Sequence, residues 1–296
     1  MPQTKTIENS FCLRRPRREW KSGKVISVSQ QNIYDNDLFF ANFLRIRSGE
    51  LNFNDVIETP ILLEMLPDLR GLDVLDLGCG MGQHARQYSG MGAASVLGID
   101  ISEKMLAYAN ANNRADNVTY CRLAMEDVGT LTTQFDLVTS SLAFDYVCDL
   151  DALFHDIRGL LKPGGQLVFS MSHPMATAWD GKYDRYTRTE TGERLYANIG
   201  NYWVEGLRRV KWVVEDYQLY HRTFSTLVNS LIGAGFVIEE CRESRVPDEL
   251  RMQHPETFGG TIHRPDFVFF RCGKAARTGT QPEPTCAIAS EAASVL

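Results

Sequence analysis

A glycine-rich turn with an acidic residue on either side is the strongest chemical signal in the chain. Gly78-Cys79-Gly80 follows the short apolar run that contains Asp76, and Asp100 ends the next apolar run. A strand, a glycine turn and a helix in this order let the backbone approach a nucleotide closely, because glycine has no side chain. A carboxylate at the end of the following strand can accept hydrogen bonds from both hydroxyls of a ribose. The spacing therefore predicts a ligand with a nucleoside part.

Two ligand classes use this arrangement, and the side chains distinguish them. A dinucleotide fingerprint continues with a third glycine at position 83, where this chain has Gln83. Asp76 lies beside the loop, where NAD would present a pyrophosphate that a fixed carboxylate repels. S-adenosylmethionine (SAM) has no phosphate, and the same carboxylate would stabilise its cationic amino group. The loop therefore predicts SAM as the cofactor and disfavours a nicotinamide oxidoreductase.

The middle of the chain alternates apolar runs with helical stretches, a pattern typical of βαβ units around a parallel sheet. Strands are expected at 74–77, 95–100, 118–121, 135–140, 166–170, 236–239 and 267–270, and helices at 153–161 and about 221–232. From His173 to about Phe224 the alternation stops and aromatic residues become frequent. Such an insertion after a sheet strand predicts a cap over the strand ends. The expected fold is α/β with an aromatic cap.

The bulk composition restricts the partners. The chain has 296 residues and a formal net charge of −6, which disfavours a nucleic-acid partner because such proteins need a basic surface. Its 7 cysteines form no C-x-x-C pair, which indicates reduced thiols, a cytoplasmic location and no metal site. No apolar run is long enough to predict a signal peptide or a membrane span. The basic run from Arg14 to Lys24 is interpreted as a solvated arm, and the alternative is contact with a second subunit in a homo-oligomer or with an anionic substrate.

Motifs over much of the chain resemble one family. The loop reads Leu75-Asp76-Leu77-Gly78-Cys79-Gly80, and the next strand continues as Gly98-Ile99-Asp100-Ile101-Ser102. Tyr34-Asp35-Asn36, Leu161-Lys162-Pro163-Gly164-Gly165, His173-Pro174 and Tyr220-His221-Arg222-Thr223 follow the same pattern. In these motifs the chain resembles class I SAM-dependent methyltransferases, specifically the bacterial type 11 small-molecule branch. The resemblance implies a Rossmann-like, doubly wound seven-stranded sheet of order 3-2-1-4-5-7-6 with the last strand antiparallel.

The resemblance also implies a set of cofactor-binding residues. The glycine loop would contact the methionine part of SAM, Asp100 the ribose, and Ile101 and Met105 the adenine face. The segment 125–127 would read the adenine edge, 141–142 would line the floor beside the sulfonium, and Tyr34 would fold over the cofactor. The implied set is Tyr34, Asp76, Gly78, Cys79, Gly80, Asp100, Ile101, Met105, Met125, Glu126, Asp127, Ser141 and Leu142.

Catalysis of methyl transfer from a sulfonium needs mainly proximity and alignment, which contribute roughly 7–11 kcal/mol. A general base is needed only where the acceptor must lose a proton, and the candidates are Asp145, His173, Tyr202 and His221. Each has a structural alternative: His173 precedes Pro174 and could cap a turn, and the cap aromatics could serve packing alone. Asp145 stands where relatives often carry histidine, so the identity of the base stays open.

The leading functional hypothesis is methyl transfer to a small, largely apolar metabolite in a natural-product pathway. Relatives include a teleocidin-type C-methyltransferase that acts on a prenyl double bond. The alternatives are an RNA or protein methyltransferase and a non-catalytic SAM-binding module. The expected organisation is an N-terminal arm with lid helices (1–50), a SAM-binding core (51–172), an aromatic cap (173–222), the end of the core (223–273) and a disordered tail (274–296).

Overall fold

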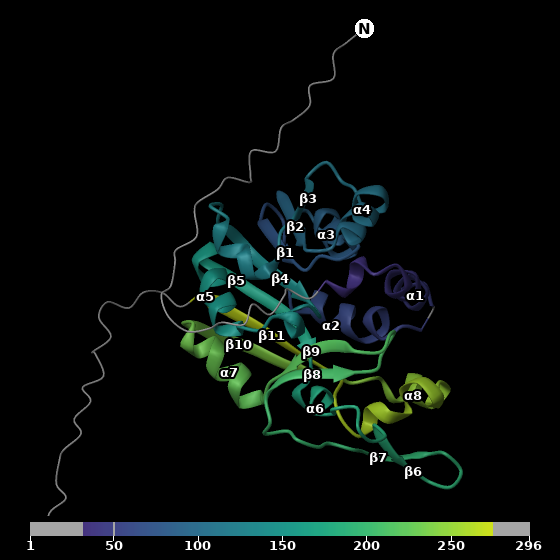
Figure 1. Ribbon diagram of the computed structural model, residues 1–296. Helices are drawn as coiled ribbons and strands as arrows, with labels where there is room; N and C mark the ends of the chain where they lie inside the picture. Colours follow the sequence, from purple (N-terminus) through teal and green to yellow (C-terminus); the bar gives the residue numbers. More distant parts are fainter. Residues whose placement is uncertain (1–31, 50, 275–296) are drawn as a thin grey trace, which may run out of the picture.

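A seven-stranded sheet forms the centre of the molecule (Figure 1), whose computed structural model describes residues 32–49 and 51–274. The strand order is β3-β2-β1-β4-β5-β11-β10, with β11 antiparallel to both of its neighbours and the other pairs parallel. This confirms the expected order 3-2-1-4-5-7-6 and the Rossmann-like fold. The strands are β1 (Asp73–Leu77), β2 (Ser95–Asp100), β3 (Val118–Arg122), β4 (Phe135–Ser141), β5 (Leu161–Ser172), β10 (Phe236–Glu243) and β11 (Phe267–Lys274).

Helices cover both faces of the sheet. Helices α2 (Thr59–Glu64) and α3 (Gln83–Gly90) contribute to one apolar cluster, and α5 (Leu150–Leu160) and α7 (Phe224–Gly233) contribute to the other. Alternate residues of the central strands supply the two clusters, because successive side chains of a strand point to opposite faces. Val74 faces α2 and α3, whereas Leu75 packs in the cluster of α5 and α7, and both are fully buried. Burial on both faces explains why the central strands read as apolar runs.

Polar side chains at the N-cap position begin several helices of the fold. Ser102 accepts from the Met105 N–H at 3.1 Å and starts α4 (Glu103–Asn112). Asp149 does the same for α5 through the Ala152 N–H, and Asn36 for α1 (Asp37–Arg47) through the Phe39 N–H. Each cap satisfies a backbone donor that the helix itself leaves free, which contributes about 1 kcal/mol.

The cap consists of two short antiparallel hairpins and the helix α6 (Pro174–Thr177). Its strands are β6 (Tyr186–Arg188), β7 (Arg194–Ala197), β8 (Gly206–Val210) and β9 (Tyr217–His221). Helices α8 (Asp248–Gln253) and α9 (Pro255–Phe258), which lie between β10 and β11 in the chain, join the cap. In Figure 1 the hairpins, α6 and α8 gather below the sheet. Arg194 ties β7 to this second segment through the carbonyl oxygens of Pro255 and Glu256.

Helix α7 begins later in the chain than expected. The expected start at about His221 is wrong, because His221 ends β9 and α7 begins at Phe224, after its N-cap residue Thr223. Most of the expected arm, with its basic run, and the tail lie outside the described residues. Within residues 32–49 and 51–274, no helix is both long enough and apolar enough to cross a bilayer.

Gly82 provides a test of how tightly the glycine loop is packed against the core. Its φ is +78°, and a Cβ there would collide with the Tyr120 hydroxyl and come within 2.9 Å of the Ala109 Cβ. We expect Gly82→Ala to lower the free energy of unfolding by about 2–4 kcal/mol, from backbone strain and overpacking together. Thermal and urea unfolding would measure the loss.

Gly71 is the matched control for this substitution. Its φ is also +78°, but a Cβ there meets no atom within 4 Å. Gly71→Ala should therefore show the cost of strain alone, about 1 kcal/mol. Equal losses for the two variants would contradict the packing argument.

Candidate active site

One large cavity lies at the carboxyl ends of the central strands, where open α/β sheets bind ligands. Its volume is about 830 Å³. Residues of the glycine loop, of the N-terminal helix α1, of the β4 end and of the cap all line it. We call this space the central cavity. It brings the expected cofactor loop and the aromatic insertion to one site.

The glycine loop and Asp100 form one hydrogen-bonded unit on the cavity wall. Gly78 and Gly80 have φ of +66° and +52°, in the left-handed region that favours glycine. The Gly80 N–H donates to Asp100 Oδ2 at 2.9 Å, and the Ser102 N–H donates to Oδ1 at 2.8 Å. These two bonds hold the carboxylate at the end of β2 with lone pairs left for a ligand. Burial is the main reason why the pKa of Asp100 is raised.

Asp76 is a buried carboxylate that lacks a full set of partners. Only 1% of the residue is exposed; Oδ1 lies 3.3 Å from the Thr139 hydroxyl, and Oδ2 has no hydrogen-bond partner among the described residues. Burial raises the pKa of Asp76 to about 7, the Thr139 hydrogen bond opposes the rise, and the charges of Asp100 and Glu58 add to it. A buried carboxylate oxygen without a donor is costly, so the site fits a ligand that brings a cationic donor.

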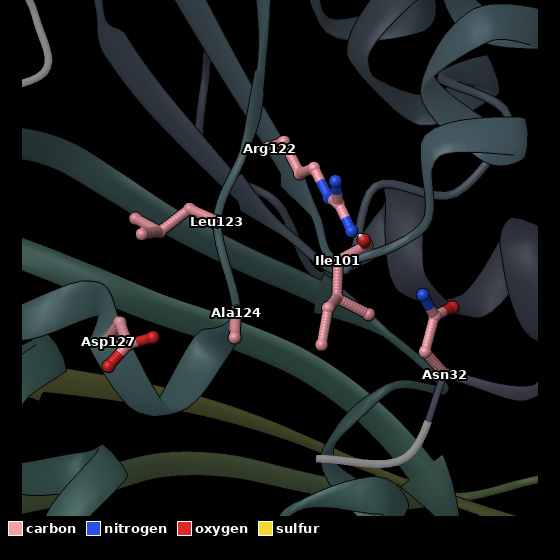
Figure 2. Close-up of a pocket in the computed structure, with 6 residues that line it drawn as sticks. All are labelled: Asn32, Ile101, Arg122, Leu123, Ala124 and Asp127. Carbon is pink, nitrogen blue, oxygen red and sulfur yellow. Dashed lines mark hydrogen bonds between the residues drawn. The ribbon is translucent and has the colours of Figure 1, made fainter. Parts of the chain in front are cut away.

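The part of the central cavity beyond the end of β2 carries the apolar and acidic residues that are expected around adenine. Ile101, Met105, Met125 and Glu126 line the central cavity, and burial raises the pKa of Glu126. Asp127 instead lines an adjoining, shallow pocket, which shares Ile101, Leu123 and Ala124 with the central cavity. Figure 2 shows Asp127 across this pocket from Asn32, with Ile101 between them. Of the two adjacent acids, only Glu126 lines the central cavity.

Tyr34 lies in the short 3-10 helix Ile33–Asp35, which its neighbour Asp35 anchors to the start of α4. Asp35 accepts hydrogen bonds from the Ser102 hydroxyl at 2.6 Å and from the Lys104 N–H at 3.1 Å. The carboxylate thus meets the N-terminus of α4, where the helix dipole favours negative charge. The motif Tyr34-Asp35-Asn36 gave no signal for this anchoring contact, because the two segments are far apart in the chain.

Glu58 connects the cavity floor to the strand ends, and the sequence carried no signal for it. It ends the π-helix Asn54–Glu58, is fully buried, and accepts from the hydroxyls of Ser141 at 2.8 Å and Ser170 at 2.5 Å. Leu142 follows in a left-handed conformation with φ of +50°, and its N–H donates to the Ser170 hydroxyl at 3.1 Å. The expected floor residues Ser141 and Leu142 both line the cavity, and this network holds them there.

Asp145 lies on the cavity wall in the short helix Phe144–Tyr146 after β4. It is 3% exposed; Oδ2 accepts from the Ser172 N–H at 3.0 Å, and Oδ1 has no partner among the described residues. Burial raises the pKa of Asp145, while the Ser172 hydrogen bonds and the charge of Arg222 oppose the rise. A carboxylate in this condition is able to accept a proton or a hydrogen bond from a ligand.

Three tyrosine hydroxyls beside Asp145 form a chain across the cavity. The Tyr146 hydroxyl is bonded to Tyr34, at 2.8 Å, and to Tyr217 of β9. Burial is the main reason why the pKa of each is raised, so all three are neutral. Two hydrogen bonds use two of the three hydroxyl hydrogens, which leaves one donor for a ligand. The chain joins the N-terminal segment, the core and the cap.

His173 and Tyr202 lie outside the cavity wall. His173 Nε2 is 2.8 Å from Glu243 Oε1, and its Nδ1 accepts from the Met175 N–H at 3.1 Å, so both ring nitrogens are engaged at the start of α6. The Tyr202 hydroxyl accepts from the Phe224 N–H at 2.9 Å. His221 bonds Thr177 and the Tyr202 carbonyl oxygen. The structure brings only Asp145 of these candidates to the cavity.

Known proteins show the same combination of loop and fold. A family model described as a methyltransferase domain matches residues 75–169. An S-adenosylmethionine dependent methyltransferase from Mesorhizobium loti, solved by crystallography, has 37% identity and a TM-score of 0.65, and the match covers 73% of this chain and 97% of that one. An uncharacterized protein of Haemophilus influenzae is 34% identical over 252 residues, which is 83% of this chain and 98% of that protein. A ubiquinone biosynthesis O-methyltransferase of Neisseria meningitidis serogroup C is 34% identical over 160 residues, 49% of this chain and 65% of that protein.

The doubly wound sheet with a ligand cavity at the glycine loop defines a nucleoside-binding α/β enzyme. With the family model and the Mesorhizobium enzyme, the chain belongs to the SAM-dependent methyltransferases, in the type 11 branch of class I. It is an enzyme of methyl transfer, and its cofactor is SAM. The unpartnered oxygen of Asp76 and the glycine backbone at the cavity wall fit that cofactor.

Proposed function

We propose that the enzyme methylates a small molecule that is held between the core and the cap. The observation that carries this proposal is the continuity of the central cavity, which runs from the glycine loop to cap residues such as Trp212 and Leu219. Its volume of about 830 Å³ is in the range of small-molecule pockets. Phe43 and Trp212 contribute aromatic walls, which suit an acceptor with an apolar portion.

In this proposal the expected cofactor residues keep their roles. Asp76 pairs with the amino group of the methionine part, Asp100 accepts from the ribose hydroxyls, and Glu126 accepts from the adenine amine. Asp127 lines the shallow pocket that adjoins the adenine end, so the adenine amine is assigned to Glu126. When bound, SAM supplies a methyl group that is already activated by the positive charge of its sulfonium.

The chain's own contribution is alignment and control of one proton. The tyrosine chain of Tyr34, Tyr146 and Tyr217 donates its remaining hydroxyl hydrogen to the acceptor and fixes the orientation of the acceptor, which is the main source of rate enhancement here. Oδ1 of Asp145 accepts the proton that the acceptor nucleophile releases as it bonds to the methyl carbon. The network of Glu58, Ser141 and Ser170 keeps the cavity floor in place.

The proposal is tested by following a labelled methyl group. The full-length protein is incubated with methyl-labelled SAM and with separate small-molecule, RNA and protein fractions of the source organism. We expect label in the small-molecule fraction and its loss in Asp100→Ala, which lacks the ribose acceptor. Label in RNA or protein would overturn the proposal in favour of a macromolecular substrate. Label in no fraction would favour a non-catalytic SAM-binding module.

A further inference from the structure

The cap hairpin β6–β7 lines the central cavity with arginines that form no ion pair in the part of the chain that the structure describes. Arg185, Arg188 and Arg194 all contribute to the wall. None of them takes part in an ion pair with a carboxylate of the described residues, although many of the chain's other arginines do. Arg188 donates to the Gly192 carbonyl oxygen, and Arg194 to two carbonyl oxygens. Because a guanidinium has five N–H donors, each arginine keeps donors for a ligand.

Arg185 shows that this part of the wall is deep and yet accessible. Its side chain is exposed to solvent, but its pKa is lowered, first by burial and second by the charge of Arg264. The two observations agree because the side chain lines the central cavity, a hollow that protein atoms surround. The guanidinium lies 4.5 Å from the centre of the Trp179 ring. Stacking on tryptophan holds a cation without neutralising it.

Asp266, an acid that also lines the cavity, does not cancel this positive charge. Its carboxylate is 2.9 Å from Arg264 Nη1. Arg264 is 4% exposed, lies 5.9 Å from the Tyr186 ring centre, and has a buried Nη2 that finds no partner among the described residues. The pair Arg264–Asp266 is therefore neutral by itself, and the three hairpin arginines leave this end of the cavity positive.

The two ends of the cavity have opposite charge. Asp76, Asp100 and Glu126 line the cofactor end, where a cationic ligand is favoured, and the hairpin arginines line the cap end. Planar guanidinium groups recognise carboxylates and phosphates through paired hydrogen bonds. We propose that the methyl acceptor is an anion whose carboxylate or phosphate group binds Arg185, Arg188 and Arg194, while its apolar part extends along Trp179 toward Asp145. This inference rests on the proposed function, because it names the class of acceptor.

Calorimetry on the full-length protein, saturated with S-adenosylhomocysteine, tests this inference without knowledge of the natural acceptor. The probes are benzoate, phenyl phosphate and the neutral benzamide, which share one aromatic ring. We expect at least one of the two anions to bind about tenfold or more tightly than benzamide, because charge-assisted hydrogen bonds to arginine are lost in the amide. The anion that binds better tells carboxylate from phosphate recognition.

The combined variant Arg185→Gln, Arg188→Gln and Arg194→Gln should abolish the preference for anions and leave the affinity for S-adenosylhomocysteine unchanged. The matched control is Arg209→Gln on the other hairpin, whose side chain pairs with Asp216 and does not line the cavity; it should keep the preference. Equal binding of benzamide and the anions, a preference that survives in the combined variant, or binding of no probe at millimolar concentration would overturn the inference. If the wild-type protein does not bind S-adenosylhomocysteine at all, that result counts against the proposed function and not against this inference.

Discussion

Replacing Asp76 by asparagine is expected to weaken SAM binding at least tenfold and, at the same time, to stabilise the ligand-free protein. Oδ2 of the buried carboxylate has no hydrogen-bond partner within residues 32–49 and 51–274, and in the proposed site the amino group of SAM donates to it as a charged donor. A charge-assisted hydrogen bond of this kind contributes about 1.5–3 kcal/mol. Asparagine keeps the shape of the side chain and the contact with Thr139 but carries no charge. The variant therefore binds SAM more weakly, and the ligand-free protein avoids the cost of burying an anion.

The sign of the pH dependence follows from the raised pKa of Asp76, about 7 in the folded chain against 3.8 ordinarily. Between these values the folded state binds a proton that the unfolded state releases, so the wild type loses stability as the pH rises toward 7. Asp76→Asn imitates the protonated form, and its advantage should grow over that window to about 2–4 kcal/mol at pH 8. SAM binding to the wild type should weaken as the pH falls through about 7, because the carboxyl becomes neutral.

Asp73 is the natural control, because it lies on the same strand as Asp76 and its surroundings lower its pKa instead of raising it. Lys162 and Ser95 bind its carboxylate and lower its pKa. Asp73→Asn should therefore lose a little stability near neutral pH and bind S-adenosylhomocysteine normally. Calorimetric titration and thermal unfolding at pH 5 and about pH 8 measure both effects. Unchanged affinity in Asp76→Asn would remove Asp76 from the cofactor site.

Replacing Asp145 by asparagine is expected to reduce kcat for methyl transfer by about 10²–10⁴-fold without changing the affinity for S-adenosylhomocysteine. Asparagine can still accept the Ser172 N–H but cannot take a proton from the acceptor. The labelled-methyl assay with the small-molecule fraction measures the loss. The raised pKa of Asp145 means that the base is protonated at low pH, so kcat of the wild type should rise with pH through that pKa. The residual activity of the variant should lack this limb.

Asp149→Asn is the control that separates the specific loss of the Asp145 carboxylate from a general effect of removing an acidic residue from this part of the chain. Asp149 caps α5 through the Ala152 N–H and does not line the cavity, and asparagine is an equally good cap. Its kcat should equal that of the wild type. If Asp145→Asn also keeps its kcat and pH profile, the acceptor is methylated without a base at this position.

The local pattern of residues is enough to predict the central sheet and the cofactor loop. Strands such as β2 are built around a buried apolar run, here residues 96–99 with one polar residue on either side, because the interior of the strand is buried on both faces. Asp76 and Asp100 are recognisable because each is a charged residue near the end of a buried strand and two residues from a glycine, Gly78 and Gly98 respectively. The helix start at about His221 failed because a strand and a helix compete over short aromatic stretches, and the pairing of β9 with β8 decides for the strand.

Contacts between segments that are distant in the chain decide which residues form the cavity floor and the cap end of the site. Glu58 meets Ser141 and Ser170 only after the sheet has formed, and the arginines of β6–β7 reach the cavity only because that hairpin folds back over the strand ends. His173 is conspicuous in the chain, yet Glu243 and the Met175 N–H occupy its ring. The sequence alone determined the βα framework and the methyl donor, because burial along a strand and a glycine turn are local properties. The tertiary structure alone decided which polar groups lack a partner and face the cavity, because a polar side chain is satisfied or left free by neighbours that are remote in the chain.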